Sequence, residues 1–201
     1  IKYLIKHMED NLFQQLEDSI IAKKSLLKQK KIITQAKKKI YLSILKKKKI
    51  LFCGNGGSAS DAQHLVAELL IRLRPNVNRK SIPAICLHMD PSTLTACSND
   101  YSYNDVFSRP LSALGQTGDI LIAISTSGES RNIIKALQTA KKMKIFSIGF
   151  LGKNGGSAKK FCDLPIIVES NITARIQEAH IFLGHYILEQ VENNLIKNKK
   201  F

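Results

Sequence analysis

The sequence predicts an α/β fold in which a parallel sheet is flanked by helices on both faces. Five short apolar runs are bounded by Gly, Ser or Pro and have the length of strands, and stretches with helical periodicity separate several of them. Strands that alternate with helices in this way form parallel sheets that are buried on both faces. The predicted strands are residues 50–53, 84–87, 120–124, 145–150 and 165–168.

The predicted helices lie before, between and after these strands. Apolar residues recur at helical spacing over residues 12–45, with lysines between them, which indicates one or two long amphipathic helices. Two further helical patterns, residues 60–73 and 130–142, follow the first and third strands. A last helix is predicted over residues 173–194, before a tail rich in Lys and Asn.

Length and composition favour one cytosolic domain. With 201 residues and 44% hydrophobic content, the chain can bury one substantial core, so we expect a single domain over residues 1–201. No run reaches the roughly 18 to 20 apolar residues of a membrane helix, and the first residues lack the features of a signal peptide. The four cysteines show no CxxC spacing and are expected to be reduced thiols.

The formal net charge of +15 raises the question of an anionic partner. A charge of this size attracts nucleic acid, anionic membrane surfaces and acidic substrates alike. The lysines cluster on predicted helix faces, connections and the tail, without interleaved aromatic residues that could stack on bases. We therefore favour a solvated surface and expect neither nucleic acid nor a membrane as partner.

Two loops rich in glycine and serine follow predicted strands and open predicted helices. Their sequences are GNGGSAS, residues 54–60, and STSGES, residues 125–130. Glycines let a ligand approach the backbone closely, and free amides and hydroxyls at a helix N-terminus suit a phosphate monoester. Each loop alone is equally well explained as a helix cap with turn glycines. Two such loops at the carboxyl ends of strands favour a ligand site, and because neither reads GxxxxGK[ST] or GxGxxG, a nucleotide is not expected.

A set of polar residues on two predicted helices could bind a metal or move protons. His64 and Glu68 are spaced i, i+4 after the first loop, and Gln177 and His185 share a face of the last helix. Two imidazoles, a carboxylate and an amide oxygen suit zinc or a similar divalent ion, and Glu and His also form an acid/base pair. A single histidine at a helix interface is more often structural, and spacing alone does not show that the two helices meet.

Four segments of the chain carry a family resemblance: CGNGGSASDAQHLVAELL (residues 53–70), STLTACSNDYSYNDVFSR (92–109), ISTSGES (124–130) and TARIQEAHIFLGH (173–185). In order and spacing they resemble the phosphoheptose isomerases of the SIS (sugar isomerase) domain family, and the similarity spans nearly the whole chain. It implies a flavodoxin-like five-stranded parallel sheet flanked by helices. It also implies a homotetramer with active sites at subunit interfaces, in which the N-terminal amphipathic helices, within about residues 1–48, serve assembly.

The activity implied by the resemblance is an aldose–ketose isomerisation. Sedoheptulose 7-phosphate is converted to D-glycero-D-manno-heptose 7-phosphate through an enediol, the first step toward bacterial ADP- or GDP-heptose precursors. By matched position the family's zinc ligands are His64, Glu68, Gln177 and His185, with one Zn²⁺ per subunit, and the acid/base candidates are Glu68 and His185. The residues expected to contact the sugar phosphate are Asn55, Gly56, Gly57, Glu68, Asn99, Asp100, Ser125, Thr126, Ser127, Ser130 and Gln177. Because a side chain bound tightly to zinc is a poor base, both roles of Glu68 and His185 stay open.

Two other functions are compatible with parts of this pattern. Non-catalytic SIS proteins that bind the replication initiator resemble the chain in all four segments but are altered at the positions of Glu68 and His185, which are intact here. Sugar-phosphate-sensing SIS modules are usually fused to a second domain, for which these 201 residues leave no room. Some relatives carry an Asp where this chain has Ala174, so no role is transferred to that position.

Overall fold

The computed structural model describes residues 11–198, and its central element is a five-stranded sheet. All pairings are parallel and the strand order is β2-β1-β3-β4-β5, with Ile50 facing both Ala84 and Ile120. The strands are β1 Ile50–Gly54, β2 Ala84–Cys86, β3 Ile120–Ser125, β4 Phe146–Gly152 and β5 Leu164–Val168. The five predicted strands and the flavodoxin-like order are thus confirmed.

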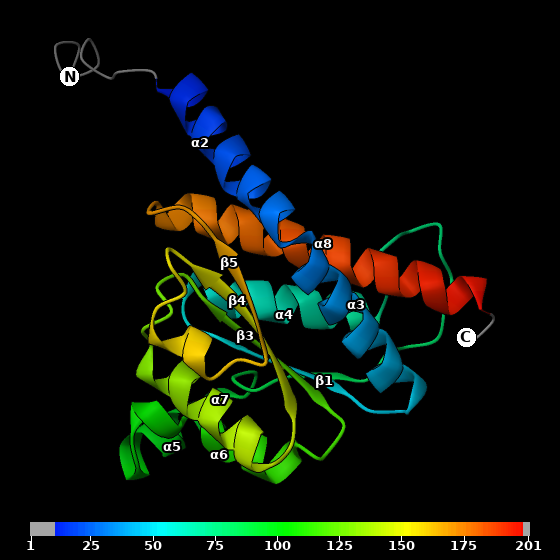
Figure 1. The fold of residues 1–201 in the computed structure, drawn as a ribbon. Helices are drawn as coiled ribbons and strands as arrows, with labels where there is room; N and C mark the ends of the chain where they lie inside the picture. The colour runs from blue at the N-terminus through cyan, green and yellow to red at the C-terminus, as the bar shows by residue number, and fades with distance from the viewer. Residues whose placement is uncertain (1–10, 199–201) are drawn as a thin grey trace, which may run out of the picture.

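Helices cover both faces of the sheet (Figure 1). One face carries α2 Leu12–Ser25, the short 3₁₀ turn η1 Leu26–Gln29, α3 Lys30–Leu45, α4 Gly57–Leu70 and α8 Thr173–Lys197. The other carries α5 Pro91–Asp100, η2 Tyr103–Asp105, α6 Ser108–Leu114, α7 Arg131–Lys142 and η3 Ser157–Lys160. Successive side chains of a strand point to opposite faces of the sheet. In β1, Ile50 and Phe52 belong to the core on the face of α4 and α8, and Leu51 and Cys53 belong to the core on the face of α7.

The N-terminal helical segment forms two helices, as the periodicity predicted, with η1 between them. Its first residues, 1–10, lie outside the described part of the chain. Helix α2 extends away from the sheet (Figure 1) and is tied to α8 by polar contacts: Ser19 Oγ donates to Glu178 at 2.6 Å, and Arg175 donates to the carbonyl oxygen of Gln15 at 2.9 Å. None of the helices within residues 11–198 combines the length with the apolar character that a membrane span requires.

A histidine in the core makes the stability of the fold sensitive to acid. His180, on α8, is fully buried next to the ring of Phe150, and neither of its ring nitrogens has a hydrogen-bond partner of good geometry. Burial lowers the pKa of His180 to about 4, and the nearby carbonyl of Leu151 offsets only part of this effect. The neutral ring is therefore the form that the folded chain accommodates.

We predict that protonation of His180 opposes folding between pH 6.5 and 4. In this window the unfolded chain binds a proton that the folded chain does not, so stability falls as pH decreases, by about 3 kcal/mol over the whole window. Denaturant unfolding at pH 7 and pH 4 measures this decrease in the free energy of unfolding. In the His180→Phe variant the decrease should be smaller by about 3 kcal/mol. An equal loss in both proteins would contradict this assignment.

Candidate functional site

The two predicted ligand loops lie side by side at the carboxyl edge of the sheet. Strands β1 and β3 are neighbours in parallel register, with Gly54 opposite Ile124, so the chain leaves both strands at the same edge. The glycine loop follows β1 and leads into α4, and the serine loop follows β3 and leads into α7. Open α/β sheets bind ligands at this edge.

The glycine loop depends on two glycines for different reasons. Gly56, at the N-cap of α4, has φ +55°, a left-handed conformation that favours glycine. A β-carbon on Gly57 would lie 2.0 Å from Nε2 of Gln177, so the amide of Gln177 rests directly on the backbone of Gly57. One predicted site residue of α8 is therefore in contact with the loop before α4.

A pair of amides joins the two loops. Asn55 and Asn132 exchange hydrogen bonds, each Nδ2 donating to the other Oδ1 at 2.9 Å, and the hydroxyl of Tyr103 donates to Asn55 at 3.1 Å. Asn132 is buried in the first turn of α7, where its Oδ1 also accepts from the amide of Ile133. Asn132 is not among the predicted site residues, although an amide among the buried positions of an amphipathic helix is a usable signal in the sequence.

The serine loop holds its hydroxyls in defined orientations. Ser125 Oγ accepts from the amide of Gly128 and Ser127 Oγ accepts from the amide of Glu129, both at 3.1 Å. Because each oxygen is used as an acceptor, its hydroxyl hydrogen is left to donate to a ligand. Ser130 is the N-cap of α7 and its side chain makes no capping bond. Hydroxyl donors at a helix N-terminus suit a phosphate group.

Three of the four predicted metal ligands converge between α4 and α8. Ligand atoms of His64, Glu68 and His185 all lie within 4.8 Å of one another. The two histidine Nε2 atoms are 2.8 Å apart, and His64 Nε2 lies 3.3 Å from Glu68 Oε1. The helices approach closely because Gly184 has no side chain: a β-carbon there would lie 2.6 Å from Leu65.

The charges in this cluster are only partly compensated within the chain. Among the described residues Glu68 Oε2 is buried without a hydrogen-bond partner, and the same holds for Oδ2 of Asp61, which lies one turn before His64 on α4. Burial raises the pKa of Asp61 to about 6, and His64 opposes part of the shift. The pKa of His185 is lowered, first by burial and then by His64, while Glu68 acts in the other direction. A neutral imidazole beside an unpartnered carboxylate oxygen is suited to bind a cation or to accept a proton.

The cluster fits a divalent metal ion. Two imidazole nitrogens and a carboxylate oxygen form a donor set typical of zinc, and a buried carboxylate oxygen without a partner needs a positive charge or a proton nearby. Gln177 lies at Gly57, at the start of the helix that carries His64 and Glu68. Asp61, which shares its helix face with the cluster, is not among the predicted site residues.

Two predicted sugar contacts, Asn99 and Asp100, are on neither of the two loops nor on the helices of the cluster. Both are exposed at the end of α5, where Asn99 Nδ2 donates to Asp100 Oδ1 at 2.8 Å. Asp100 lines a separate cavity of about 770 Å³ between α5 and α6, together with Tyr101 and Arg109. The following segment does reach the glycine loop, through the Tyr103 hydroxyl.

Comparisons with known proteins identify relatives of the whole chain. Residues 17–152 match the SIS domain family. The chain is 46% identical over 195 residues to a phosphoheptose isomerase from Clostridium acetobutylicum, covering 96% of this chain and 98% of the relative. It is 55% identical over 144 residues to a phosphoheptose isomerase from Paramagnetospirillum magneticum, covering 72% of this chain and 74% of the relative.

Solved structures agree with these relatives. The phosphoheptose isomerase from Neisseria gonorrhoeae superposes with a TM-score of 0.85 at 36% identity, covering 91% of this chain and 97% of that one. A phosphoheptose isomerase from Francisella tularensis superposes with a TM-score of 0.86 at 33% identity, covering 92% and 97%.

Proposed function

Because the chain belongs to the phosphoheptose isomerases of the SIS domain family, we propose that it converts sedoheptulose 7-phosphate to D-glycero-D-manno-heptose 7-phosphate. The chain is a sugar-phosphate isomerase of heptose synthesis. The observation that carries the specific reaction is the convergence of His64, Glu68 and His185 beside two loops suited to an anionic sugar. We place the enzyme in the cytoplasm, where its phosphorylated substrate is found.

In this proposal the loops bind the substrate and keep it in one orientation. The phosphate is held by the serine loop, with donors from Ser125, Thr126, Ser127 and Ser130. The sugar extends toward the cluster along the glycine loop, where Asn55 is already oriented by Asn132 and Tyr103. The other proposed sugar contacts are Gly56, Gly57, Asn99, Asp100 and Gln177.

Glu68 and His185 would move the protons. One group removes a proton from C1 of the ketose and returns a proton at C2, and the other protonates the carbonyl oxygen at C2 and takes the hydroxyl proton at C1. Glu68 has two carboxylate oxygens, of which Oε1 faces His64 and Oε2 has no hydrogen-bond partner within residues 11–198. It can therefore serve both as a ligand and as a base.

A zinc ion held by His64, Glu68, Gln177 and His185, one per subunit, would supply positive charge that stabilises the negative charge developing on the substrate oxygens. The choice of zinc rests on the donor set and on the family resemblance. The alternative of a non-catalytic regulator is not supported, since the close relatives above are isomerases.

The reaction is tested by incubating purified protein with sedoheptulose 7-phosphate and detecting the aldose phosphate. In D₂O, proton transfer through an enediol should also introduce deuterium from the solvent at the carbon that receives a proton. If zinc-loaded protein forms neither the aldose nor the deuterated sugar, the proposal is wrong.

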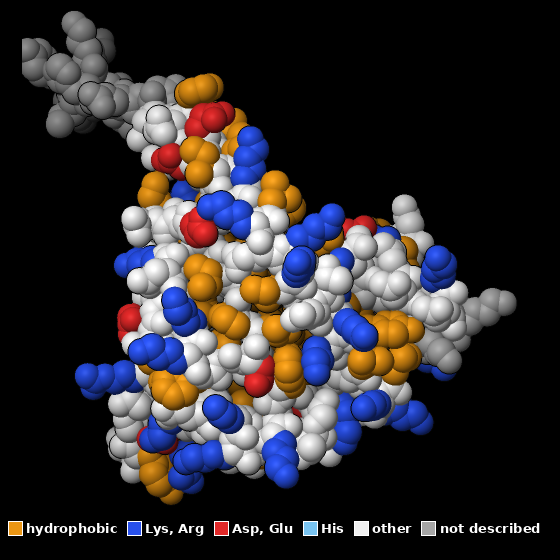
Figure 2. Space-filling view, viewed as in Figure 1, with side chains coloured by type: hydrophobic (Ala, Val, Ile, Leu, Met, Phe, Trp, Pro, Cys, Tyr) orange, Lys and Arg blue, Asp and Glu red, His pale blue; other side chains and the backbone are white. Residues whose placement is uncertain are grey.

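We also propose that the enzyme is a homotetramer, because the N-terminal helices expose apolar residues that a monomer leaves in water. Phe13, Ile21 and Leu27 are 76%, 59% and 74% exposed, and apolar side chains follow α2 and the neighbouring surface (Figure 2). An apolar cavity of about 480 Å³ lies between these helices and α8, lined in part by Leu27 and Phe182. Exposed apolar surface of this kind marks an interface.

Light scattering on the purified chain should therefore give the mass of four 22.5 kDa chains. Leu27→Glu and Phe182→Glu should reduce that mass, because each would bury a charge at the interface. Leu114→Glu is the control, since Leu114 is 47% exposed, as Phe182 is at 48%, but lies on the opposite face of the sheet. A monomeric wild-type protein at micromolar concentration would rule out the assembly.

A further inference from the structure

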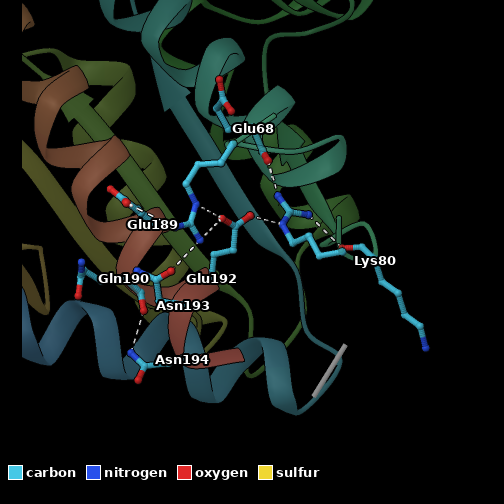
Figure 3. A network of polar contacts seen from close by, with 9 residues as sticks. Glu68, Lys80, Glu189, Gln190, Glu192, Asn193 and Asn194 are labelled. Atoms are coloured by element: carbon cyan, nitrogen blue, oxygen red, sulfur yellow. Dashed lines mark hydrogen bonds and ion pairs between the residues drawn. The ribbon is translucent and has the colours of Figure 1, made fainter. Parts of the chain in front are cut away.

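A buried ion pair joins the two helices of the cluster at a point outside it (Figure 3). Arg79 lies in the segment between α4 and β2, and Glu192 lies on α8 about two turns after His185. Arg79 Nε donates to Glu192 Oε1 at 2.6 Å, and both side chains are only 2% exposed. Burial to this degree is unusual for either residue type and requires full pairing.

The remaining donors of Arg79 bind the end of α4. Nη2 donates to the carbonyl oxygen of Glu68 at 2.5 Å, and Nη1 donates to the carbonyl oxygen of Leu69 at 2.9 Å. Nη1 also donates to the carbonyl oxygen of Lys80 at 3.0 Å. The last carbonyls of a helix lack partners within it, so Arg79 caps α4 at the residue that supplies the carboxylate of the cluster.

This contact is the third in a series along α4 and α8. The first joins Gly57 to Gln177 and the second joins Leu65 to Gly184. The third runs from the Glu68 carbonyl through Arg79 to Glu192. Because the residue numbers of these contacts increase together on both helices, α4 and α8 run parallel. The cluster of His64, Glu68 and His185 lies between the first contact and the third.

A second arginine pairs with Glu192 without reaching α4. Arg74 donates to Glu192 Oε2 at 2.8 Å and to Asn193 Oδ1 at 2.7 Å, and it also lies 3.6 Å from Glu189. All three partners are on α8, and the Arg74 side chain is 30% exposed. Both arginines therefore neutralise Glu192, but of the two only Arg79 also donates to the end of α4.

Stability alone does not explain the pair. Burying two charges costs desolvation energy that the ion pair only partly recovers, and well-packed apolar residues at such positions stabilise a protein equally well or better. The planar guanidinium does something an apolar contact cannot, since it binds several acceptors in one fixed geometry. Here three of the four acceptors, the carbonyl oxygens of Glu68 and Leu69 and the carboxylate of Glu192, belong to the two helices whose separation sets the spacing of the cluster.

We propose that Arg79, paired with Glu192, is a positioning residue that holds the ligand atoms of Glu68 and His185 at the spacing needed to bind a metal ion. The inference rests on the metal site of the proposed function, but it can be tested without the sugar substrate. Both side chains are only 2% exposed and are fully engaged with each other and with the backbone, which leaves neither of them open to a substrate. Both act through the helices that carry the cluster.

The test is titration of metal-free tetramer with Co²⁺, followed by the visible absorption of the bound ion, which reports ligand geometry. Arg79→Met should lower Co²⁺ affinity about 10- to 100-fold and alter the spectrum, as changes around metal ligands do. Arg74→Met, the matched control, should change the affinity by less than about twofold, because a partly exposed pair contributes little. In activity assays Arg79→Met should lower kcat more than it raises KM.

The double variant Arg79→Met/Glu192→Met separates positioning from stability. It leaves no unpaired charge in the core, so it should fold even if Arg79→Met does not, and it should regain thermal stability. Its Co²⁺ affinity should stay low. Recovery of affinity together with stability, equal effects of the two arginine variants, or a wild type that binds no Co²⁺ would each overturn the inference. A wild type that binds Co²⁺ normally but fails to isomerise the heptulose phosphate would refute the proposed function and leave this inference standing.

Discussion

Glu68→Gln and His185→Asn are each expected to lower turnover by at least about 100-fold, the typical effect of removing an acid/base group. Glu68→Gln preserves side-chain volume, and His185→Asn shortens a side chain that is only partly buried, so the fold and the assembly should survive. Bound zinc, measured by elemental analysis, should fall in the same variants, because each loses a ligand atom of the cluster. Circular dichroism and light scattering show whether the fold and the assembly are intact, so that the loss of turnover can be assigned to the missing side-chain groups.

Two comparisons sharpen this prediction. The double variant should be little worse than the worse single variant, since groups that act as one unit are not additive. Glu189→Gln is the matched control: it makes the same chemical change one turn after His185, at a side chain that is 44% exposed and lies 3.6 Å from Arg74. If Glu68→Gln keeps wild-type turnover, the carboxylate is not part of the proton transfer.

Replacing both Ser125 and Ser127 with Ala should raise KM for sedoheptulose 7-phosphate by roughly 100-fold and lower kcat much less. In the proposed site each hydroxyl donates to the phosphate, a charged group that does not change during the reaction, and such hydrogen bonds contribute about 1.5 kcal/mol or more each. Loss of an interaction made equally in the ground and transition states appears in KM. Steady-state kinetics measures the changes in KM and kcat separately. Weaker inhibition of the double variant by inorganic phosphate is an independent test of phosphate binding.

The control for the serine variants is Ser112→Ala. The Ser112 hydroxyl donates to the carbonyl oxygen of Ser108 within α6, away from the carboxyl edge of the sheet. It should leave KM unchanged. An unaltered KM in the Ser125/Ser127 double variant would show that the phosphate binds elsewhere.

Much of the fold can be predicted from local sequence patterns, the apolar runs and the helical periodicity. The apolar runs became the five strands because a strand buried on both faces must be apolar throughout, and α7, predicted over residues 130–142, spans Arg131–Lys142. Helices α5 and α6 were not predicted. Only Cys97 of α5 is buried, so no apolar stripe marks that helix, and its only local signal is Asp90 as N-cap with Pro91 at the first position.

Some features of the site can likewise be predicted from local sequence patterns, and others depend on the tertiary structure. The shared helix face of His64 and Glu68 and the positions of the glycine and serine loops after two strands follow from the sequence alone, because helical period and strand ends are local properties. Only the tertiary structure decided that α4 meets α8 at Gly184, that Asn132 binds Asn55, and that Arg79 joins Glu68 to Glu192. Such contacts bring together residues far apart in the chain, and their distances depend on how the helices pack rather than on the spacing of residues along the sequence.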